Sequence, residues 1–172
     1  MNKNDLPFID NVTFDEMTIG QSASLQRTLT QQDIQLFAVM SGDVNPAHVD
    51  PEYAEHSMFH GIIGHGMWGG ALISTVLGTQ LPGPGTIYLK QSLKFSRPVT
   101  VGDTVTVSVT VREKQPEKRR VIFDCCARNQ RGETVISGEA EVLAPTEKIH
   151  RHRVPMPVVH LDEPTESLEV QP

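Results

Sequence analysis

Apolar and polar residues alternate over most of the second half of the chain. Between positions 105 and 111, valine occupies every second position and threonine or serine lies between. The same period of two continues in three neighbouring segments, 87–95, 121–127 and 134–144. A period of two is typical of strands with one covered face, so this half predicts an antiparallel sheet.

The first half shows one candidate strand, 20–29, and then patterns of helical spacing. Thr30 looks like an N-cap, and the apolar positions after it predict a short amphipathic helix over 31–40, which ends at Ser41-Gly42. Asp50-Pro51 has the chemistry of a second helix start, with Asp as the cap and Pro in the first turn. That helix is expected to reach about residue 59.

The segment 66–78 is apolar nearly all round and holds several small residues. A helix of this kind is expected to be buried rather than to lie on a surface. One long buried helix wrapped by an antiparallel sheet is an α+β architecture. The pattern is lost after Pro145, so we expect a domain over 1–145 and a linker or extended tail over 146–172.

Composition narrows the class of protein. With 172 residues, 38% hydrophobic and 21% charged, the chain suits one globular domain. A net charge of −6 argues against a nucleic-acid binder. No stretch approaches the ~18 apolar residues that a membrane span needs, and 1–10 lacks a signal-peptide run. The adjacent Cys125 and Cys126 are expected to be reduced thiols, which predicts a cytoplasmic protein.

The densest candidate chemistry lies in 37–50. Each polar residue there has a structural explanation, because Asp43 and Asn45 are good turn residues and Asp50 can cap a helix. However, Asp43 and His48 are separated by a rigid Asn-Pro turn that could bring both side chains to one point. A carboxylate and an imidazole that converge can hold a water and move its protons.

The segment Ser41-Gly42-Asp43-Val44-Asn45-Pro46-Ala47-His48-Val49-Asp50 resembles the hydratase-2 motif of the MaoC-like, (R)-specific enoyl-CoA hydratases. His65-Gly66-Met67 is similar to the second signature of that family, at the mouth of its central helix. Further similarity follows in 83–88 and 95–99, so the resemblance covers roughly 15–144 in the expected order. It implies a hot-dog fold, in which the sheet wraps around the helix.

The resemblance also implies roles for individual residues. Asp43 and His48 would activate water and supply a proton, and Asn45 would orient this pair. The backbone N–H of Gly66 would hold the thioester oxygen, a role that suits an amide at a helix N-terminus. Further residues would lie against the substrate: Ser74, His65 and Met67.

The implied reaction is the reversible (R)-specific hydration of trans-2-enoyl-CoA, without a metal or redox cofactor. Two alternatives stay open: a thioesterase of the same fold, and a non-catalytic acyl-CoA-binding module. The lead-in 60–64 is richer in glycine than the resemblance would suggest, which bears on the acyl pocket and leaves the preferred chain length open. Hot-dog domains of this family pair sheet edge to sheet edge, so a homodimer or higher homo-oligomer is expected.

Three further features have competing interpretations. His56, His60 and His65 have some of the spacing of a zinc site, but no intervening carboxylate, so solvated histidines are favoured over a metal. The basic residues of 112–120 are interpreted as a solvated hairpin, with contact to coenzyme A phosphates as the alternative. Residues 143–153 resemble the region after the hydratase module in fusions with a phosphate acyltransferase domain.

Overall fold

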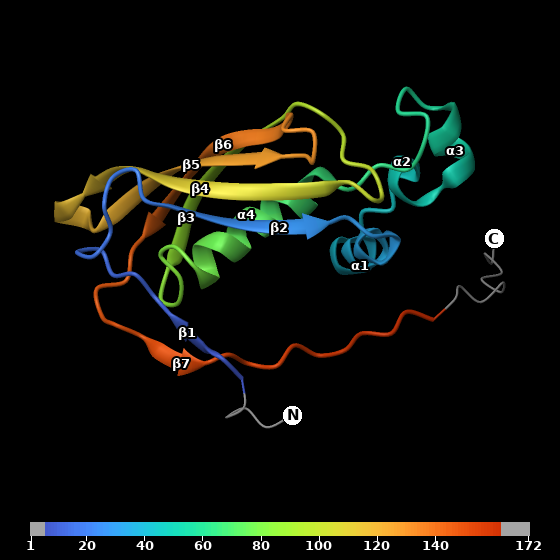
Figure 1. The fold of residues 1–172 in the computed structure, drawn as a ribbon. Helices are drawn as coiled ribbons and strands as arrows, with labels where there is room; N and C mark the ends of the chain where they lie inside the picture. Colours follow the sequence, from blue (N-terminus) through green and yellow to red (C-terminus); the bar gives the residue numbers. More distant parts are fainter. Residues whose placement is uncertain (1–5, 163–172) are drawn as a thin grey trace.

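A five-stranded antiparallel sheet and one helix packed against it form the body of the protein (Figure 1). The computed structural model describes residues 6–162. The strand order is β2-β4-β5-β6-β3, with bounds Ser22–Thr28, Thr104–Gln115, Arg120–Arg128, Thr134–Leu143 and Ile87–Phe95. A 3-10 turn over Pro116–Lys118 joins β4 to β5. The predicted α+β, hot-dog architecture is therefore confirmed.

The alternating pattern decides which face of the sheet is covered. The valines of β4 are all buried, whereas the threonines and serine between them are only partly covered. Inward-facing residues of β5 and β6 continue this layer, including Phe123, Ala127, Ala140 and Val142. Since burial of apolar area is the main favourable term in folding, this shared face orients the sheet toward the helix.

The helix α4, Gly66–Thr79, lies against this covered face (Figure 1). Its buried side carries Trp68, Leu72, Ile73, Val76 and Leu77. The expectation of burial all round is wrong for the opposite side, which is exposed at Met67, Ala71, Ser74, Thr75 and Gly78. Within this chain the sheet covers one side of the helix and no described element covers the other.

Three short helices lie at one end of the sheet. α1, Gln31–Ser41, begins with the predicted cap: the Thr30 hydroxyl accepts from Asp33 N–H, and the Asp33 carboxylate accepts from Thr30 N–H. α3, Pro51–His56, begins at Asp50 as predicted but ends before residue 59. α2, Pro46–Val49, was not expected from the sequence. These helices carry the residues of the candidate motif.

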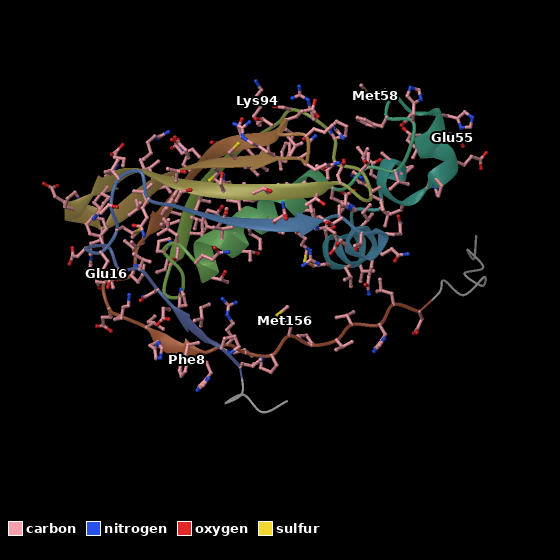
Figure 2. All side chains as sticks on the ribbon, in the orientation of Figure 1. Phe8, Glu16, Glu55, Met58, Lys94 and Met156 are labelled. Carbon is pink, nitrogen blue, oxygen red and sulfur yellow. The ribbon has the colours of Figure 1, made fainter. Side chains whose placement is uncertain are left out.

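A two-stranded ribbon lies apart from the main sheet, formed by β1, Phe8–Asp10, and β7, His150–His152. The Phe8 ring packs 4.1 Å from the His150 ring and 4.0 Å from the His152 ring, between ring centroids. The pairing was not predicted, because it joins segments about as distant in sequence as the chain allows. The rest of the expected tail up to 162 is extended, with Met156 projecting 86% exposed (Figure 2), and 163–172 lie outside the described residues.

Candidate active site

The loop between α1 and α2 is shaped by local hydrogen bonds. Gly42 ends α1 in the left-handed conformation, with φ of 75°. Asp43 then accepts a hydrogen bond on its carboxylate from Asn45 N–H at 3.2 Å. The Asn45 side chain accepts from Ala47 N–H and caps α2, so Asn45 holds the turn that separates Asp43 from His48. This arrangement fits the predicted orienting role.

The structure brings Asp43, His48 and His65 together. Their side-chain ligand atoms all lie within 4.8 Å of one another. His48 Nδ1 lies 2.8 Å from the carbonyl oxygen of Ile63, and because a carbonyl can only accept, Nδ1 carries the hydrogen. His48 Nε2 is thereby left as the nitrogen that can accept a proton, which is the orientation that an acid–base histidine needs.

His65 is buried, with 4% of its surface exposed, and it contacts both other members of this cluster. Its Nε2 donates to the backbone oxygen of Asp43 at 2.9 Å, and its ring lies 4.0 Å from the His48 ring between centroids. Among the described residues, His65 Nδ1 is the only buried side-chain nitrogen or oxygen without a hydrogen-bond partner. Buried polar atoms without a partner are uncommon in folded proteins.

The N-terminus of α4 opens at the same place. His65 is the N-cap residue but makes no side-chain hydrogen bond to the first turn of the helix. The first N–H groups of a helix have no partner within it, so the amide of Gly66 is available to an oxygen from outside. An amide in this position stabilises a developing negative charge.

An apolar cavity of about 300 Å³ adjoins His48, His65 and Gly66. The lead-in to α4 contributes Phe59, Ile63 and Gly64, so the glycine-rich segment noted in the sequence does border it. The rest of the wall comes from α4, the end of β3, the β3–β4 connection and the inward faces of β4 and β6: Trp68, Gly69, Phe95, Ser96, Arg97, Pro98, Val99, Val105, Val135 and Ile136. The apolar part of this wall was not identified as functional from the sequence, because only the strand register brings it together.

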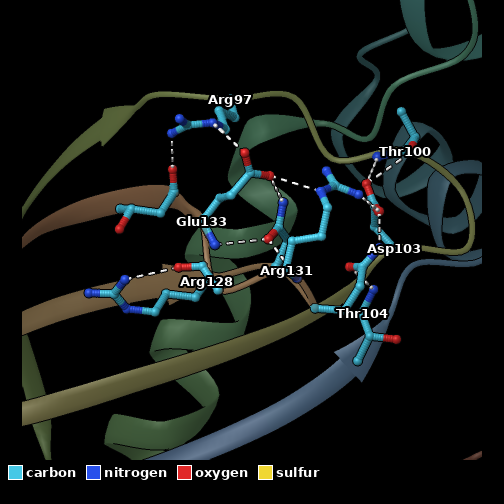
Figure 3. Close-up of polar contacts among 11 residues, drawn as sticks. Arg97, Thr100, Asp103, Thr104, Arg128, Arg131 and Glu133 are labelled. Atoms are coloured by element: carbon cyan, nitrogen blue, oxygen red, sulfur yellow. Dashed lines mark hydrogen bonds and ion pairs between the residues drawn. The ribbon is translucent and has the colours of Figure 1, made fainter.

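Arg97 is the charged residue of the cavity wall, and a polar network holds it (Figure 3). Its guanidinium donates to the Thr134 carbonyl at 3.1 Å and lies 3.5 Å from the Glu133 carboxylate. Glu133 is also bonded to Arg131 at 2.9 Å. The pKa of the Glu133 carboxyl is lowered, first by a hydrogen bond from Asn129 and then by Arg131, so Glu133 stays a carboxylate beside Arg97.

Two predicted substrate-binding residues lie elsewhere. Met67, 54% exposed, and the exposed Ser74 are on the uncovered side of α4, where they border a surface groove with Tyr88 and Leu89 of β3. The cavity and this groove are distinct in the single chain. The structure therefore groups His65 with the candidate catalytic pair and leaves Met67 and Ser74 outside the cavity.

The remaining alternatives can be compared with the same geometry. The sequence favours solvated histidines over a zinc site for His56, His60 and His65. Among the described residues, His65 groups with Asp43 and His48, whereas His56 and His60 are exposed and belong to no group that could hold a metal ion. Asp43, His48 and His65 are the described residues whose spacing could hold a metal ion. In the basic hairpin, Arg112 pairs with Asp124 and Glu139, and Arg120 pairs with Glu141, so these two arginines are already engaged.

Residues 15–124 match the family model described as MaoC like domain. The chain belongs to the MaoC-like domain family. The match spans the loop with Asp43 and His48, helix α4 and the cavity wall up to β5. A relative from Rhodospirillum rubrum, named (R)-specific enoyl-CoA hydratase, is 52% identical over 132 residues, which cover 77% of this chain and 91% of the relative.

Solved structures of the family have the same fold. The unliganded R-hydratase PhaJ1 from Pseudomonas aeruginosa superposes with a TM-score of 0.87 and 44% identity, covering 91% of this chain and all of that chain. The (R)-hydratase from Aeromonas caviae, described as involved in PHA biosynthesis, has a TM-score of 0.73 and 40% identity, covering 75% and 98%. Within the part of the chain that the structure describes, no helix is long and apolar enough to cross a bilayer.

Proposed function

We propose that this protein is a hydro-lyase that reversibly adds water to trans-2-enoyl-CoA and forms (R)-3-hydroxyacyl-CoA. The observation that carries the proposal is that Asp43 lies beside His48, and that His48 and the N-terminus of α4 line one apolar cavity. The similarity to (R)-specific enoyl-CoA hydratases supports the substrate class and the stereochemistry. The chemistry requires no metal or redox cofactor.

In the proposed reaction, Asp43 and His48 act as one acid–base unit. A water held by this pair attacks the β-carbon, a C–O bond forms, and the pair takes the proton that the water loses. The α-carbon then receives a proton from the pair, so the unit ends in its starting state. His48 would act through Nε2, because Nδ1 is engaged by the Ile63 carbonyl.

Between these two proton transfers the thioester oxygen carries negative charge. The amide of Gly66 would donate to that oxygen, which polarises the carbonyl and makes the β-carbon electrophilic. Loss of one such donor typically costs ~10²–10³-fold in rate. The apolar cavity beside it excludes water from the acyl chain, and Trp68, Val135 and Ile136 would limit the length of chain that fits.

The deciding experiment is hydration of crotonyl-CoA, followed by the loss of the conjugated enoyl thioester. Asp43→Asn and His48→Ala should each lower kcat by ~10²–10⁴-fold, since each removes one partner of the proton transfer. The matched controls are Asp15→Asn and His56→Ala, at exposed positions outside the cavity, which should keep wild-type kcat. Circular dichroism and melting curves would establish that all four variants fold.

Release of free coenzyme A would identify a thioesterase in the same assay. Acyl-CoA binding without turnover of enoyl-CoA of any length would identify a binding module. Either result would refute the hydratase proposal.

We also propose that the protein forms at least a dimer through the β3 edge. β3 is an end strand of the sheet, and Ile87, Leu89 and Phe95 on it are 44–55% exposed. An exposed apolar edge strand is a template for pairing with another strand. The uncovered side of α4 lies beside it, so a second copy would cover Met67 and Ser74 and could bring them to the substrate.

Sedimentation velocity would test this assembly. Leu89→Arg should shift the protein toward monomer, because it places a charge at the pairing edge, whereas Ile19→Arg at an exposed site away from β3 should not. A wild-type monomer at micromolar concentration would contradict the proposal.

We also propose that the protein acts in the cytoplasm, because Cys125 and Cys126 are free thiols. Fusion to a phosphate acyltransferase domain stays a prediction.

A further inference from the structure

His65 makes the hydrogen bond that ties the Asp43 turn to the rest of the protein. Among the described residues, the other hydrogen bonds of Asp43 involve Ser41 and Asn45, which belong to its own turn. The bond from His65 Nε2 to the Asp43 backbone oxygen, 2.9 Å long, spans 22 positions of sequence. Among the described residues, this is the hydrogen bond of Asp43 that reaches beyond its own turn.

The His48 side of the site is held differently. His48 Nδ1 donates to the Ile63 carbonyl, and Ile63 N–H donates to the Ala47 carbonyl at 3.2 Å. Two hydrogen bonds thus attach this half of the loop to the strand-like segment before α4. Among the described residues, no hydrogen bond from Ile63 reaches Asp43, whose backbone oxygen accepts from His65 instead. The two members of the catalytic pair are therefore anchored separately.

His65 occupies the N-cap position of α4 but does not cap the helix with its side chain. A good cap accepts a hydrogen bond from the first turn of its helix, and the His65 side chain makes none there. Its ring instead packs against the rings of Phe37, 4.8 Å away between centroids, and His48, 4.0 Å away. His65 thus does not cap α4, and its Nδ1 has no hydrogen-bond partner among the described residues. Its Nε2 and its ring instead contact Asp43 and His48.

We infer that His65 is a positioning residue, which sets the distance between the Asp43 carboxylate and His48 through the hydrogen bond to the Asp43 backbone. This differs from the predicted contact with substrate, and it rests on the proposed hydratase function. His65 does not itself carry a proton in the reaction. Misplacement of a catalytic group by about 1 Å can cost ~10²-fold in rate, so loss of this bond should have a large effect on turnover.

The test compares His65→Gln with His65→Leu. The amide nitrogen of glutamine reaches about as far as Nε2 and can donate to the Asp43 carbonyl, whereas leucine fills the space without a donor. We expect His65→Leu to lower kcat for crotonyl-CoA by ~10²-fold with little change in KM, and His65→Gln to recover most of that loss. The same two substitutions at the exposed His56 are the matched control and should leave kcat unchanged.

Two outcomes would overturn the inference. Wild-type kcat in His65→Leu would show that the bond is dispensable. An equal loss in both His65 variants would show that the hydrogen bond to Asp43 is not the contribution, since glutamine restores the donor but cannot transfer a proton. A loss that merely follows a lower folded fraction would also contradict it, so the melting temperature of each variant is measured beside kcat.

Hydrogen exchange separates this inference from the proposed function. The Asn45 amide, which donates to the Asp43 carboxylate, should exchange faster in His65→Leu than in wild type and at the wild-type rate in His65→Gln. Should wild type lack hydratase activity, the proposed function fails, and the exchange rates still decide whether His65 holds the turn. Equal exchange rates in all three proteins would refute the positioning role.

Discussion

A single methyl group at Gly138 should disturb the sheet more than most core substitutions. Gly138 lies in β6, opposite Leu93 of β3 on one side and Cys125 of β5 on the other. A Cβ at this position would overlap the carbonyl oxygen of Ser92, and it would lie 2.9 Å from the Ser92 carbonyl carbon and 3.2 Å from Leu93 Cα. All of these are backbone atoms, which cannot rotate away as a side chain can.

The loss in the free energy of unfolding follows from the separation of β3 and β6 that the added methyl group requires. β3 has to move away from β6, which strains the packing by about 1–3 kcal/mol and weakens about two ladder hydrogen bonds that contribute about 1 kcal/mol each. Alanine offsets about 0.5–1 kcal/mol of this, because glycine is unfavourable within a strand. The net loss in the free energy of unfolding for Gly138→Ala is then about 3 kcal/mol. For a chain of this size that corresponds to a melting temperature lower by roughly 6–12 °C.

Scanning calorimetry at one fixed protein concentration would measure this shift, since the concentration affects the apparent stability of an oligomer. The matched control is Ser137→Ala, the neighbouring residue, which already has a Cβ and should change stability by no more than about 0.5 kcal/mol. A Gly138→Ala protein that melts within about 2 °C of wild type would refute the reasoning. So would an equal decrease in the control.

Three other predictions concern the cavity, pH and thiol chemistry. Gly69→Ala should push the Ile136 side chain into the cavity, because the added methyl would overlap its terminal carbon, and kcat/KM should fall more for longer enoyl-CoA than for crotonyl-CoA. Burial acts to raise the pKa of the Asp103 carboxyl, but hydrogen bonds, chiefly from Gln130, hold the pKa below its usual 3.8. The stability that this carboxylate contributes is fully present above pH 3.8 and is lost as the pH falls through the lowered pKa of the folded state. Asp103→Asn should therefore lower the melting temperature more at about pH 7 than at about pH 3, and equal losses would contradict this. Burial raises the pKa of the Cys125 thiol to about 11, so a thiol reagent at about pH 8 should modify Cys125 only in urea. Fast labelling of Cys125 in the native protein, located by mass spectrometry, would contradict this prediction.

Local interactions explain why much of the fold can be predicted from the sequence alone. The valines of β4 alternate because one face of the strand is buried, and that pattern can be seen without a structure. The Thr30 cap with Asp33 and the Asp50 cap with Pro51 involve residues at most three apart, so their hydrogen bonds follow from the sequence. The hot-dog fold and the specific part that Asp43 and His48 play in hydration are implied instead by the resemblance of residues 41–50 to a known motif.

Contacts between distant residues could not be predicted in this way. The pairing of β1 with β7 depends on where the chain ends meet, and no periodicity encodes it. The apolar pattern of α4 correctly predicted a helix, but only the sheet decides which side is covered, so the exposure of Met67 and Ser74 was missed. Periodicity describes an element, whereas burial depends on its neighbours.

The candidate site shows the same division. The sequence alone predicts that a carboxylate and an imidazole lie on either side of an Asn-Pro turn, because the turn is local chemistry. The fold of the whole domain is what brings His65, 22 positions beyond Asp43, to the Asp43 backbone and places its ring against that of His48. The cavity beside them likewise exists because strand register brings residues of β4 and β6 to the start of α4. Such contacts depend on packing over the whole domain, and packing is a property of the folded chain rather than of any segment.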